Sequence, residues 1–282
     1  MNRNNKIVGA HLCVRPCLMN RYFIYLAYNG TRYCGWQNQP NGVSIQQCIE
    51  EVLSKVLRQT IVVTGAGRTD AGVHARRMVA HFDTMTTIDE PAQLTGKMNK
   101  MLPDDIAVFQ IIPVTPNAHA RFDALSRTYK YIISDRKNPF RHEYVYRMPL
   151  QSVSFERMNE ACSVLFDYTD FTSFSKVHTN TKTNRCRIDE ARWEKSGDLW
   201  VFTVKANRFL RNMVRSLVGT LLDVGRDRLT IRDFREIIEA KDRCRAGMSI
   251  APQGLSLAEI EYPDQLFLDK IEKNEPNDLY FL

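Results

Sequence analysis

Residues 65–75 of this chain read Gly65-Ala66-Gly67-Arg68-Thr69-Asp70-Ala71-Gly72-Val73-His74-Ala75. A β-rich run, Thr60-Ile61-Val62-Val63-Thr64, leads into this stretch. Its three glycines permit backbone angles that other residues resist, so we expect a tight bend whose main chain a partner can approach closely. Asp70 is the single carboxylate in the bend, and Arg68 stands two residues before it.

Three interpretations of this bend are open. A dinucleotide-binding loop would explain a G-x-G pattern after a strand, but Asp70 stands where the third glycine belongs, and its charge repels a pyrophosphate. A structural turn would have Asp70 cap a helix and pair with Arg68. An activated carboxylate would have Asp70 at the floor of a cleft. The bend alone does not decide between the last two.

Size and composition describe a soluble globular protein. The 282 residues suffice for one large domain or two ordinary ones. No apolar run approaches the ~18–20 residues needed to span a bilayer, and the N-terminus lacks a signal-peptide pattern. The seven scattered cysteines fit reduced thiols, so we expect a cytoplasmic protein. His11, Cys13 and Cys17 have no second pair of ligands nearby, so no metal is expected.

The charge of the chain is positive and uneven. The net charge is +7, yet the residues from Glu259 onward carry seven acids against two lysines, a balance of −5. The preceding 258 residues therefore carry a balance of +12. A basic body with interleaved aromatic residues predicts a polyanionic partner, without separating RNA from DNA.

Apolar periodicity predicts an α+β fold in which helices cover one face of a sheet. The predicted strands lie at 22–28, 79–82, 106–112, 126–134, 187–195, 199–206 and 255–260. The predicted helices lie at 44–57, 91–102, 154–166 and 210–224, and a further one opens at Thr230.

The same pattern predicts how the chain is divided. Residues 1–18 lack periodicity and are expected to be a peripheral extension, since the first strong strand follows Met19. Residues 19–115 form a first α+β half that carries the Asp70 loop, and residues 116–261 form a second half. Residues 262–282 are an acidic tail that we expect to pack loosely.

Five stretches of the sequence resemble the tRNA pseudouridine synthase A family. The first is the run of eleven residues at 65–75, and in that family the aspartate of this signature is the catalytic nucleophile, which implies that role for Asp70. The other four stretches are 118–124, 127–131, 170–174 and 207–215. The resemblance as a whole runs from about Arg21 to Leu257, most of the chain.

The resemblance implies roles for Tyr129 and Arg215. Tyr129 corresponds to a tyrosine that stacks on the target base, and a phenol suits this task because its ring stacks while its hydroxyl passes a proton. Arg215 corresponds to an arginine that reaches the aspartate, favours its ionised form and orients it. From pattern alone, Tyr129 could be ordinary strand packing. Arg211 and Arg215, at i and i+4, could be a solvated basic flank.

Other residues are implied as substrate contacts. Arg68 would stabilise the carboxylate with Arg215 and fill the space that the target base leaves, and Thr69 adjoins the nucleophile. His119 and Arg121 lie in a loop that contacts RNA in the family. Possible phosphate contacts are Arg76, Arg77, Arg121, Lys130 and Arg211, each of which could equally be a solvated charge. Phe171 is expected in the core.

Two departures from the family pattern affect the expected pocket wall. Cys34 stands where the family usually has an aromatic residue or histidine, and the segment 251–255 is one residue short of its family counterpart. Neither departure touches Asp70, Tyr129 or Arg215.

The resemblance implies two ferredoxin-like (RRM-like) halves joined into one mostly antiparallel sheet, with an RNA-binding cleft between them. It implies isomerisation of uridine to pseudouridine at positions 38, 39 and 40 of the tRNA anticodon stem-loop, without a cofactor. It also implies a homodimer in which one protomer grips the tRNA body while its partner performs the chemistry.

Two other functions are open. A non-catalytic RNA-binding protein of the same fold would need only the basic charge and the two halves. A nucleoside glycosidase would need a second carboxylate across the bond, and the nearest acids, Asp83, Asp104 and Asp105, are expected in turns or loops.

Overall fold

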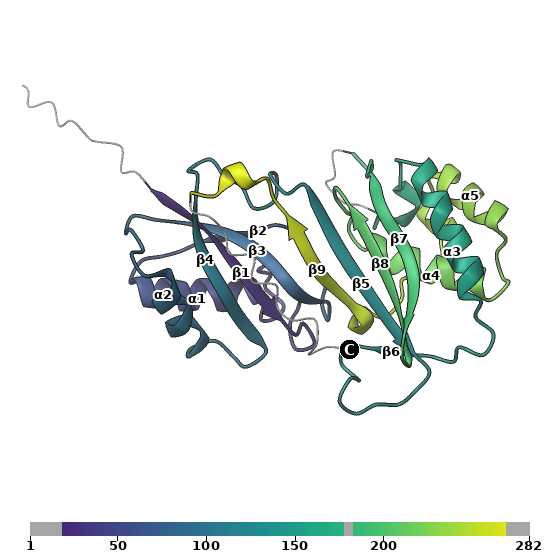
Figure 1. Ribbon diagram of the computed structural model, residues 1–282, viewed down its shortest axis with the longest axis horizontal. Helices are drawn as coiled ribbons and strands as arrows, with labels where there is room; N and C mark the ends of the chain where they lie inside the picture. Colours follow the sequence, from purple (N-terminus) through teal and green to yellow (C-terminus); the bar gives the residue numbers. More distant parts are fainter. Residues whose placement is uncertain (1–18, 178–182, 269–282) are drawn as a thin grey trace, which may run out of the picture.

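The computed structural model describes residues 19–177 and 183–268. Within them, nine strands form one sheet whose main path runs β4-β1-β3-β9-β5-β8-β7, with β2 paired to β3 and β6 paired to β5 (Figure 1). The strands are β1 (Asn20–Tyr28), β2 (Val63–Gly65), β3 (His74–Thr84), β4 (Ile106–Val114), β5 (Ser126–Ser134), β6 (Tyr146–Arg147), β7 (Ile188–Ser196), β8 (Leu199–Ala206) and β9 (Leu255–Glu261). Only the β3–β9 and β5–β6 pairs are parallel, which confirms a mostly antiparallel α+β sheet.

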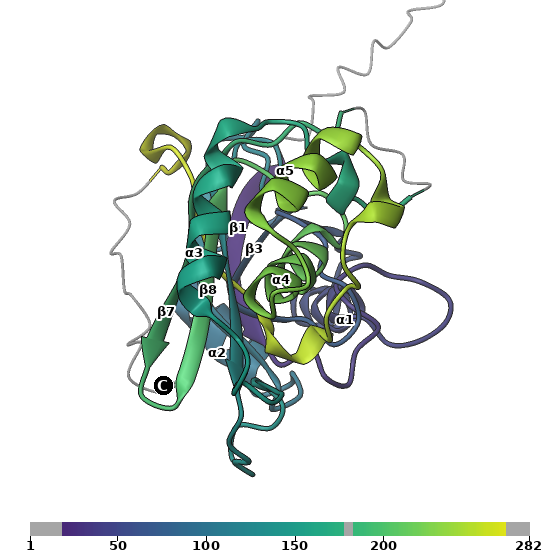
Figure 2. The ribbon, with the colours of Figure 1, turned by 90° about the vertical axis from the view of Figure 1, so that its right-hand side faces the viewer.

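The described residues form five α-helices, of which α5 packs on α3 and α4, and α1 and α4 lie on the same side of the sheet (Figure 2). They are α1 (Ile45–Leu57), α2 (Pro91–Asn99), α3 (Phe155–Val164), α4 (Met213–Gly225) and α5 (Ile231–Ala240). Helices α1 and α5 begin where expected because both are capped: Ser44 Oγ accepts from the N–H of Gln47, and Thr230 forms a capping box with Asp233. No helix in this part of the chain is long and apolar enough to cross a membrane.

Helix α4 begins three residues later than its apolar pattern predicts. Asn212 has a φ of 65°, in the left-handed region, and a right-handed helix cannot run through such a residue. Leu210 and Arg211 therefore precede the helix, and the prediction that Arg211 and Arg215 share one helical flank is wrong. The apolar side chains of this segment are nevertheless buried, as at Leu210, Met213 and Leu217.

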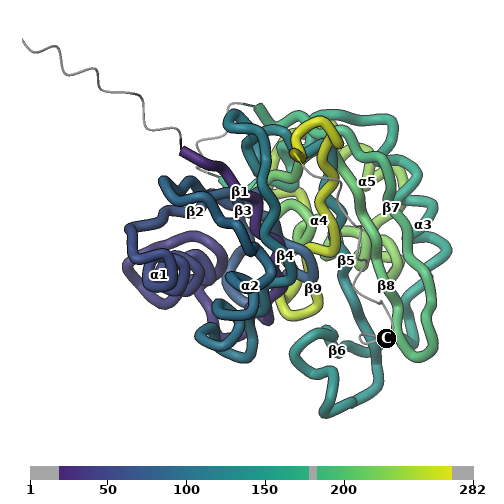
Figure 3. The backbone as a smooth tube through the Cα atoms, turned by 60° about the vertical axis from the view of Figure 1, so that its left-hand side comes forward, coloured from purple at the N-terminus to yellow at the C-terminus, as the bar shows by residue number. Residues whose placement is uncertain are grey.

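The core consists of two main clusters of apolar side chains, one at each end of the sheet. The first gathers side chains of β1, β3, β4, α1 and α2, and the second gathers those of β5, β7, β8 and α3–α5. Strand β9 lies between β3 and β5 (Figure 3). It contributes side chains to both core clusters, with Leu257 in the first and Leu255 in the second. The predicted boundary after residue 115 stays a prediction.

The start of the C-terminal tail packs more tightly than its composition suggests. Tyr262 Oη donates to the carbonyl of Ala120, and its ring meets Phe23 edge-on at a centroid distance of 5.0 Å. Phe267 also packs on Phe23 and bridges to Val114 of β4. The expectation of loose packing is therefore wrong for residues 262–268, because their apolar side chains cover the face of β1. The rest of the tail and residues 1–18 lie outside the described residues.

Candidate active site

Asp70 lies in the loop between β2 and β3, and two arginines approach its carboxylate. Arg211 Nε lies 3.8 Å from Oδ1, and Arg215 Nη1 lies 3.8 Å from Oδ2. Arg215 is itself fixed, because its Nε donates to the carbonyl of Ile250 at 2.7 Å. The side chain of Asp70 stays 29% exposed, so the carboxylate is oriented by two positive charges and still open to solvent.

The loop from Ala66 to Val73 is held by contacts to its main chain. The carbonyl of Thr69 accepts from the N–H of Trp36 at 3.2 Å, and the N–H of Ala66 donates to the carbonyl of Val79 at 2.8 Å. The hydroxyl of Thr69 is buried and hydrogen-bonded to Tyr28 Oη at 2.9 Å. Thr69 thus faces the interior and positions the loop, and the substrate contact implied for it stays a prediction.

The local geometry excludes two of the three interpretations of the bend. The loop leads into strand β3 and not into a helix, so Asp70 caps no helix and no helix N-terminus receives a pyrophosphate. Of the three glycines, only Gly72 adopts a positive φ, of 76°. The remaining interpretation is an exposed carboxylate on a fixed loop.

Tyr129 lies on β5 beside this loop, half-buried, with its ring edge-on to Phe209 at a centroid distance of 5.0 Å. A bulge between β5 and β9 falls at this position, since Thr128 pairs with Glu259 and Tyr129 with Leu257. Such a bulge changes the aim of a side chain next to a site. Burial raises the pKa of Tyr129 to about 12, with Asp70 raising it further and Arg127 opposing. The phenol therefore stays protonated at neutral pH and can donate a hydrogen bond.

Arg127 connects the segments around Asp70, a role that the sequence did not reveal. Its Nη1 donates to the carbonyls of Ala124 at 3.0 Å and Asn207 at 2.9 Å. Its Nη2 donates to the carbonyls of Ala66 and Arg121. One guanidinium therefore ties the Asp70 loop, the 115–124 loop and the segment before α4 to strand β5. The only feature of the sequence that could have indicated this role is the position of Arg127 two residues before Tyr129.

Three arginines gather at the rim of the site. Burial lowers the pKa of Arg121, and the nearby charges of Arg68 and Arg208 lower it further. The Arg121 guanidinium lies 5.8 Å from the ring centroid of Phe122, whose side chain is 75% exposed. Positive charges that lie close together without carboxylate partners among the described residues favour binding of a polyanion. The exposed ring of Phe122 offers a face on which a base can stack.

His119 shapes the loop that carries Arg121. Its Nδ1 accepts from the N–H groups of Arg121 at 3.1 Å and Phe122 at 3.3 Å. Burial lowers the pKa of His119, and the positive charge of Arg21 acts in the same direction. A neutral His119 can accept both bonds, which gives it a structural role in this loop.

Several other predicted contacts lie elsewhere. Arg68 forms no ion pair with Asp70 in the described part of the chain, and Arg211 stands there in its place. Lys130 lies on the face of β5 opposite to Tyr129, where it lines a cavity of about 340 Å³. Asp83 lies in β3 and not in a turn, and it pairs with Arg21 at 2.7 Å. Phe171 is fully buried, which confirms it as a core residue.

The larger cavity does not contain the predicted catalytic residues. It has a volume of about 580 Å³ and lies at the loop after β5. Neither cavity is lined by Asp70, Tyr129 or Arg215, and the RNA-binding cleft between the halves stays a prediction.

No metal site emerges within the described residues, because no three His, Cys, Asp or Glu side chains gather in a way that could hold an ion. His11, Cys13 and Cys17, considered above as ligands, lie outside those residues.

Comparison with known proteins identifies the family. The family model described as tRNA pseudouridine synthase matches residues 24–123 and 166–263. This chain belongs to that family. The matched residues include Asp70 and Arg215, whereas Tyr129 falls between the two matched ranges.

Three similar relatives are each named tRNA pseudouridine synthase A. The protein of Parabacteroides distasonis is 59% identical over 88% of this chain and 98% of its own length. That of Porphyromonas gingivalis is 55% identical over 89% of this chain and 100% of its own length. That of Bacteroides thetaiotaomicron is 54% identical over 91% of this chain and 96% of its own length.

Proposed function

We propose that this protein isomerises uridine to pseudouridine in tRNA, with Asp70 as the nucleophile. The observation that carries the proposal is the open carboxylate of Asp70 between the guanidinium groups of Arg211 and Arg215. Two guanidinium groups on either side of a carboxylate hold it in one orientation, which a nucleophile requires. The name and the family of the relatives support the same reaction.

The reaction breaks the N1–C1′ glycosidic bond and joins C1′ to C5 of the same uracil. The C5 hydrogen leaves as a proton and N1 gains one, so the product has the atoms of the substrate and no electrons are gained or lost. This balance requires no cofactor. Asp70 attacks C1′, attacks C6 or removes the 2′ proton, and all three routes use its ionised form.

The other residues act on the base and its backbone. Tyr129 stacks on the uracil and, as a protonated phenol, donates to a position that gains a proton. The target base leaves its stack at a cost of a few kcal/mol, and Arg68 occupies the space behind it. Arg121, supported by the loop that His119 shapes, binds backbone phosphates.

The finer features of the proposal rest on the family resemblance. The targets are uridines 38, 39 and 40 of the anticodon stem-loop. The protein acts in the cytoplasm as a homodimer, in which one protomer grips the tRNA body while its partner carries out the isomerisation.

The test uses a tRNA transcript labelled with tritium at uridine C5, because this hydrogen leaves only when the new C–C bond forms. We expect release by the wild-type protein and none by Asp70→Asn, a substitution that keeps the shape and removes the charge. The tRNA affinity of the variant should stay within a few-fold. Asp89→Asn, on the turn before α2, is the matched control and should release tritium normally.

The outcomes separate the competing functions. Release by Asp70→Asn at most of the wild-type rate would rule out Asp70 as nucleophile. Tight binding without any release would indicate a non-catalytic tRNA-binding protein, and free uracil in the mixture would indicate a glycosidase.

A further inference from the structure

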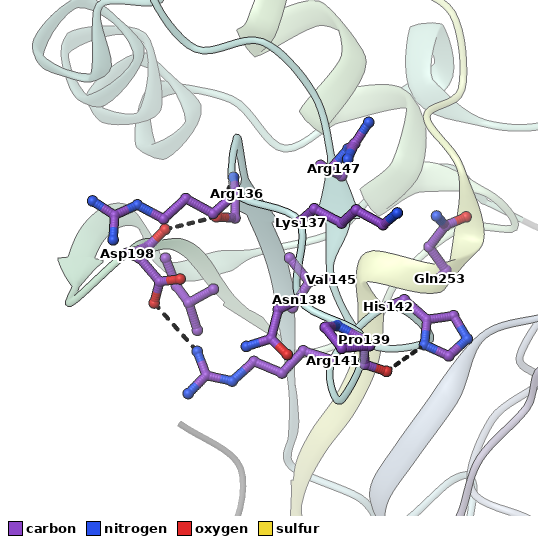
Figure 4. A pocket seen from close by; sticks show the side chains of 12 residues that line it. Arg136, Lys137, Asn138, Pro139, Arg141, His142, Val145, Arg147, Asp198 and Gln253 are labelled. Atoms are coloured by element: carbon purple, nitrogen blue, oxygen red, sulfur yellow. Dashed lines mark hydrogen bonds and ion pairs between the residues drawn. The ribbon is translucent and has the colours of Figure 1, made fainter.

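The larger cavity is separate from Asp70 and lies between the loop that follows β5 and the turn that joins β7 to β8. Residues 135–145, here the 135–145 loop, supply much of its wall, and Arg147 of β6 and Gln253 complete it (Figure 4). Its volume of about 580 Å³ is large enough for a nucleotide unit. We refer to it as the basic pocket.

The lining of the basic pocket is positively charged. Its cationic side chains are Arg136, Lys137, Arg141 and Arg147, and its one anionic side chain is Asp198, which leaves a net charge of +3. Arg141 is neutralised, since its Nη1 lies 3.3 Å from Asp198 Oδ1 (Figure 4). No carboxylate among the described residues pairs with Arg136, Lys137 or Arg147. Asp135 and Glu143 belong to the same loop but do not line the pocket.

An exposed aromatic residue, Phe140, belongs to the same loop as Arg136 and Lys137, outside the lining of the pocket. Phe140 is 92% exposed, the highest value among the large apolar side chains of the described residues. Its position is fixed by a turn, because the N–H of Phe140 donates to Asn138 Oδ1 at 2.9 Å. A phenyl ring exposed to water on a loop that also carries unpaired cations is a typical arrangement for binding a nucleic acid, whose phosphates meet the charges and whose base stacks on the ring.

The basic pocket adjoins the back of the Asp70 loop. The Nε2 of His74, the first residue of β3, is hydrogen-bonded to the carbonyl of Gln253 at 3.1 Å. The ring of Tyr144 lies 5.0 Å from that of His74, and Asn29 Nδ2 donates to Tyr144 Oη at 3.1 Å. The wall of the pocket and the end of the Asp70 loop therefore share contacts at one edge of the sheet.

We propose that the basic pocket is a second tRNA-binding site, which binds backbone phosphates through Arg136, Lys137 and Arg147, while an unpaired base stacks on Phe140 of the adjoining loop. This inference rests on tRNA as the substrate proposed above. A second copy of this chain fits less well, because a two-fold axis through this surface would bring the same positive charges together.

The experiment removes the three unpaired charges together, as Arg136→Gln, Lys137→Gln and Arg147→Gln in one chain. The matched control, Lys55→Gln with Lys97→Gln and Lys100→Gln on and beside α1 and α2, removes the same charge from another surface. Binding of a labelled tRNA transcript is measured between 50 and 250 mM KCl. Each lost phosphate contact lowers the slope of log K against log[salt] by about 0.7–0.9.

We expect the triple variant to bind roughly tenfold more weakly at low salt, with a slope smaller by about 2, while the control stays close to wild type. Phe140→Ala should weaken binding several-fold without changing the slope, because stacking involves no counterion. In tritium release, the triple variant should show its loss in KM and not in kcat.

Two results would overturn the proposal. Equal weakening in the triple variant and its control would mean that only overall charge matters. A change of oligomeric mass in sedimentation velocity would assign the surface to a second copy of the chain. Failure of the proposed function would give a different result from failure of this second site. The wild-type protein would then release no tritium, while the two triple variants would still differ in tRNA binding.

Discussion

The loop that carries Asp70 and the 135–145 loop meet the same edge of the sheet but are held in different ways. They share that edge because β3 is parallel to β9 and β9 is antiparallel to β5. The Asp70 loop is fixed through its main chain by Val79 of the following strand and by Trp36 and Arg127, which come from distant parts of the sequence. The main chain of the 135–145 loop bonds largely within the loop, as from the N–H of Tyr144 to the carbonyl of Arg141, and its long-range contacts are made by side chains.

This difference separates two tasks. A nucleophile must keep its geometry within a fraction of an ångström, so its loop requires many long-range contacts. A surface that captures a polyanion requires charge and reach more than exact placement, so exposed side chains on a loop whose main chain bonds mostly to itself are sufficient. Substitutions that touch the two loops should therefore differ strongly in their effects.

The largest effect is expected from Arg127→Ala. The variant leaves four main-chain carbonyls without their donor and frees three segments around Asp70, and a displacement of about 1 Å can cost about a hundredfold in rate. We expect kcat for tritium release to fall about a hundredfold with a smaller change in KM. Arg127→Lys should restore part of the rate, because an ammonium group reaches fewer of the four carbonyls.

Arg187→Ala is the control for this prediction. Arg187 is an exposed arginine that pairs with Asp189 at 2.7 Å, and its removal should leave kcat unchanged. A kcat of Arg127→Ala near that of the control would contradict the positioning role of Arg127.

The second effect concerns Gly35, which approaches the main chain of the Asp70 loop. Gly35 has a φ of 99°, and a Cβ there would stand 2.4 Å from the carbonyl oxygen of Thr69. Gly35→Ala should lower the free energy of unfolding by about 3 kcal/mol, from strain and from displacement of the loop. Gly67→Ala is the control, since a Cβ at Gly67 meets nothing within 4 Å. Equal denaturation midpoints for the two variants would contradict the prediction.

A third effect is on acid stability. Burial, with the charges of Arg21 and His119, lowers the pKa of His81 to about 4, and its Nδ1 accepts from the N–H of Ala120. As the pH falls from about 6.5 to about 4, His81 therefore becomes protonated in the unfolded chain but stays neutral in the folded one. Stability should fall across this window by about 2–3 kcal/mol and not change further through this group below it.

His81→Asn tests this assignment, because its side-chain oxygen can still accept from Ala120 and it does not titrate. Urea denaturation at several pH values should show a flatter acid limb for the variant than for wild type. Parallel limbs would mean that His81 is not the group responsible.

The smallest effect is expected in the 135–145 loop. Phe140 is almost fully exposed, so Phe140→Ala removes little packing and should change the free energy of unfolding by less than about 0.5 kcal/mol. A loss of 2 kcal/mol or more in thermal or urea unfolding would show that the ring is buried in the solution state and would erase the contrast between the two loops.

The sequence was sufficient to predict the secondary structure wherever that structure depends on residues close together in the chain. The bounds of β5 and β8 match the predicted 126–134 and 199–206, because apolar alternation reports burial directly. The caps at Ser44 and Thr230 followed from residues three positions apart. The start of α4 was missed because a single left-handed residue, Asn212, overrode an apolar pattern that continued through it.

The candidate site was predicted in part. Asp70 and Arg215 were found through a family resemblance, and the structure brings them together although 145 positions separate them in the chain. Arg211 was expected at a phosphate and lies at the carboxylate, because the backbone turn at Asn212 takes it out of the helix. Arg127 was missed because its partners are main-chain carbonyls, which every residue carries and no sequence pattern distinguishes.

By itself, the sequence determined the fold class, most of the elements, the positive charge and the family of this protein, because these depend on composition, periodicity and short motifs. Only the tertiary structure decided which arginines meet Asp70, which guanidinium holds the surrounding segments, and where the unpaired charges of the basic pocket gather. The physical reason is that such contacts join residues far apart in the chain, and their geometry is set by the packing of the sheet.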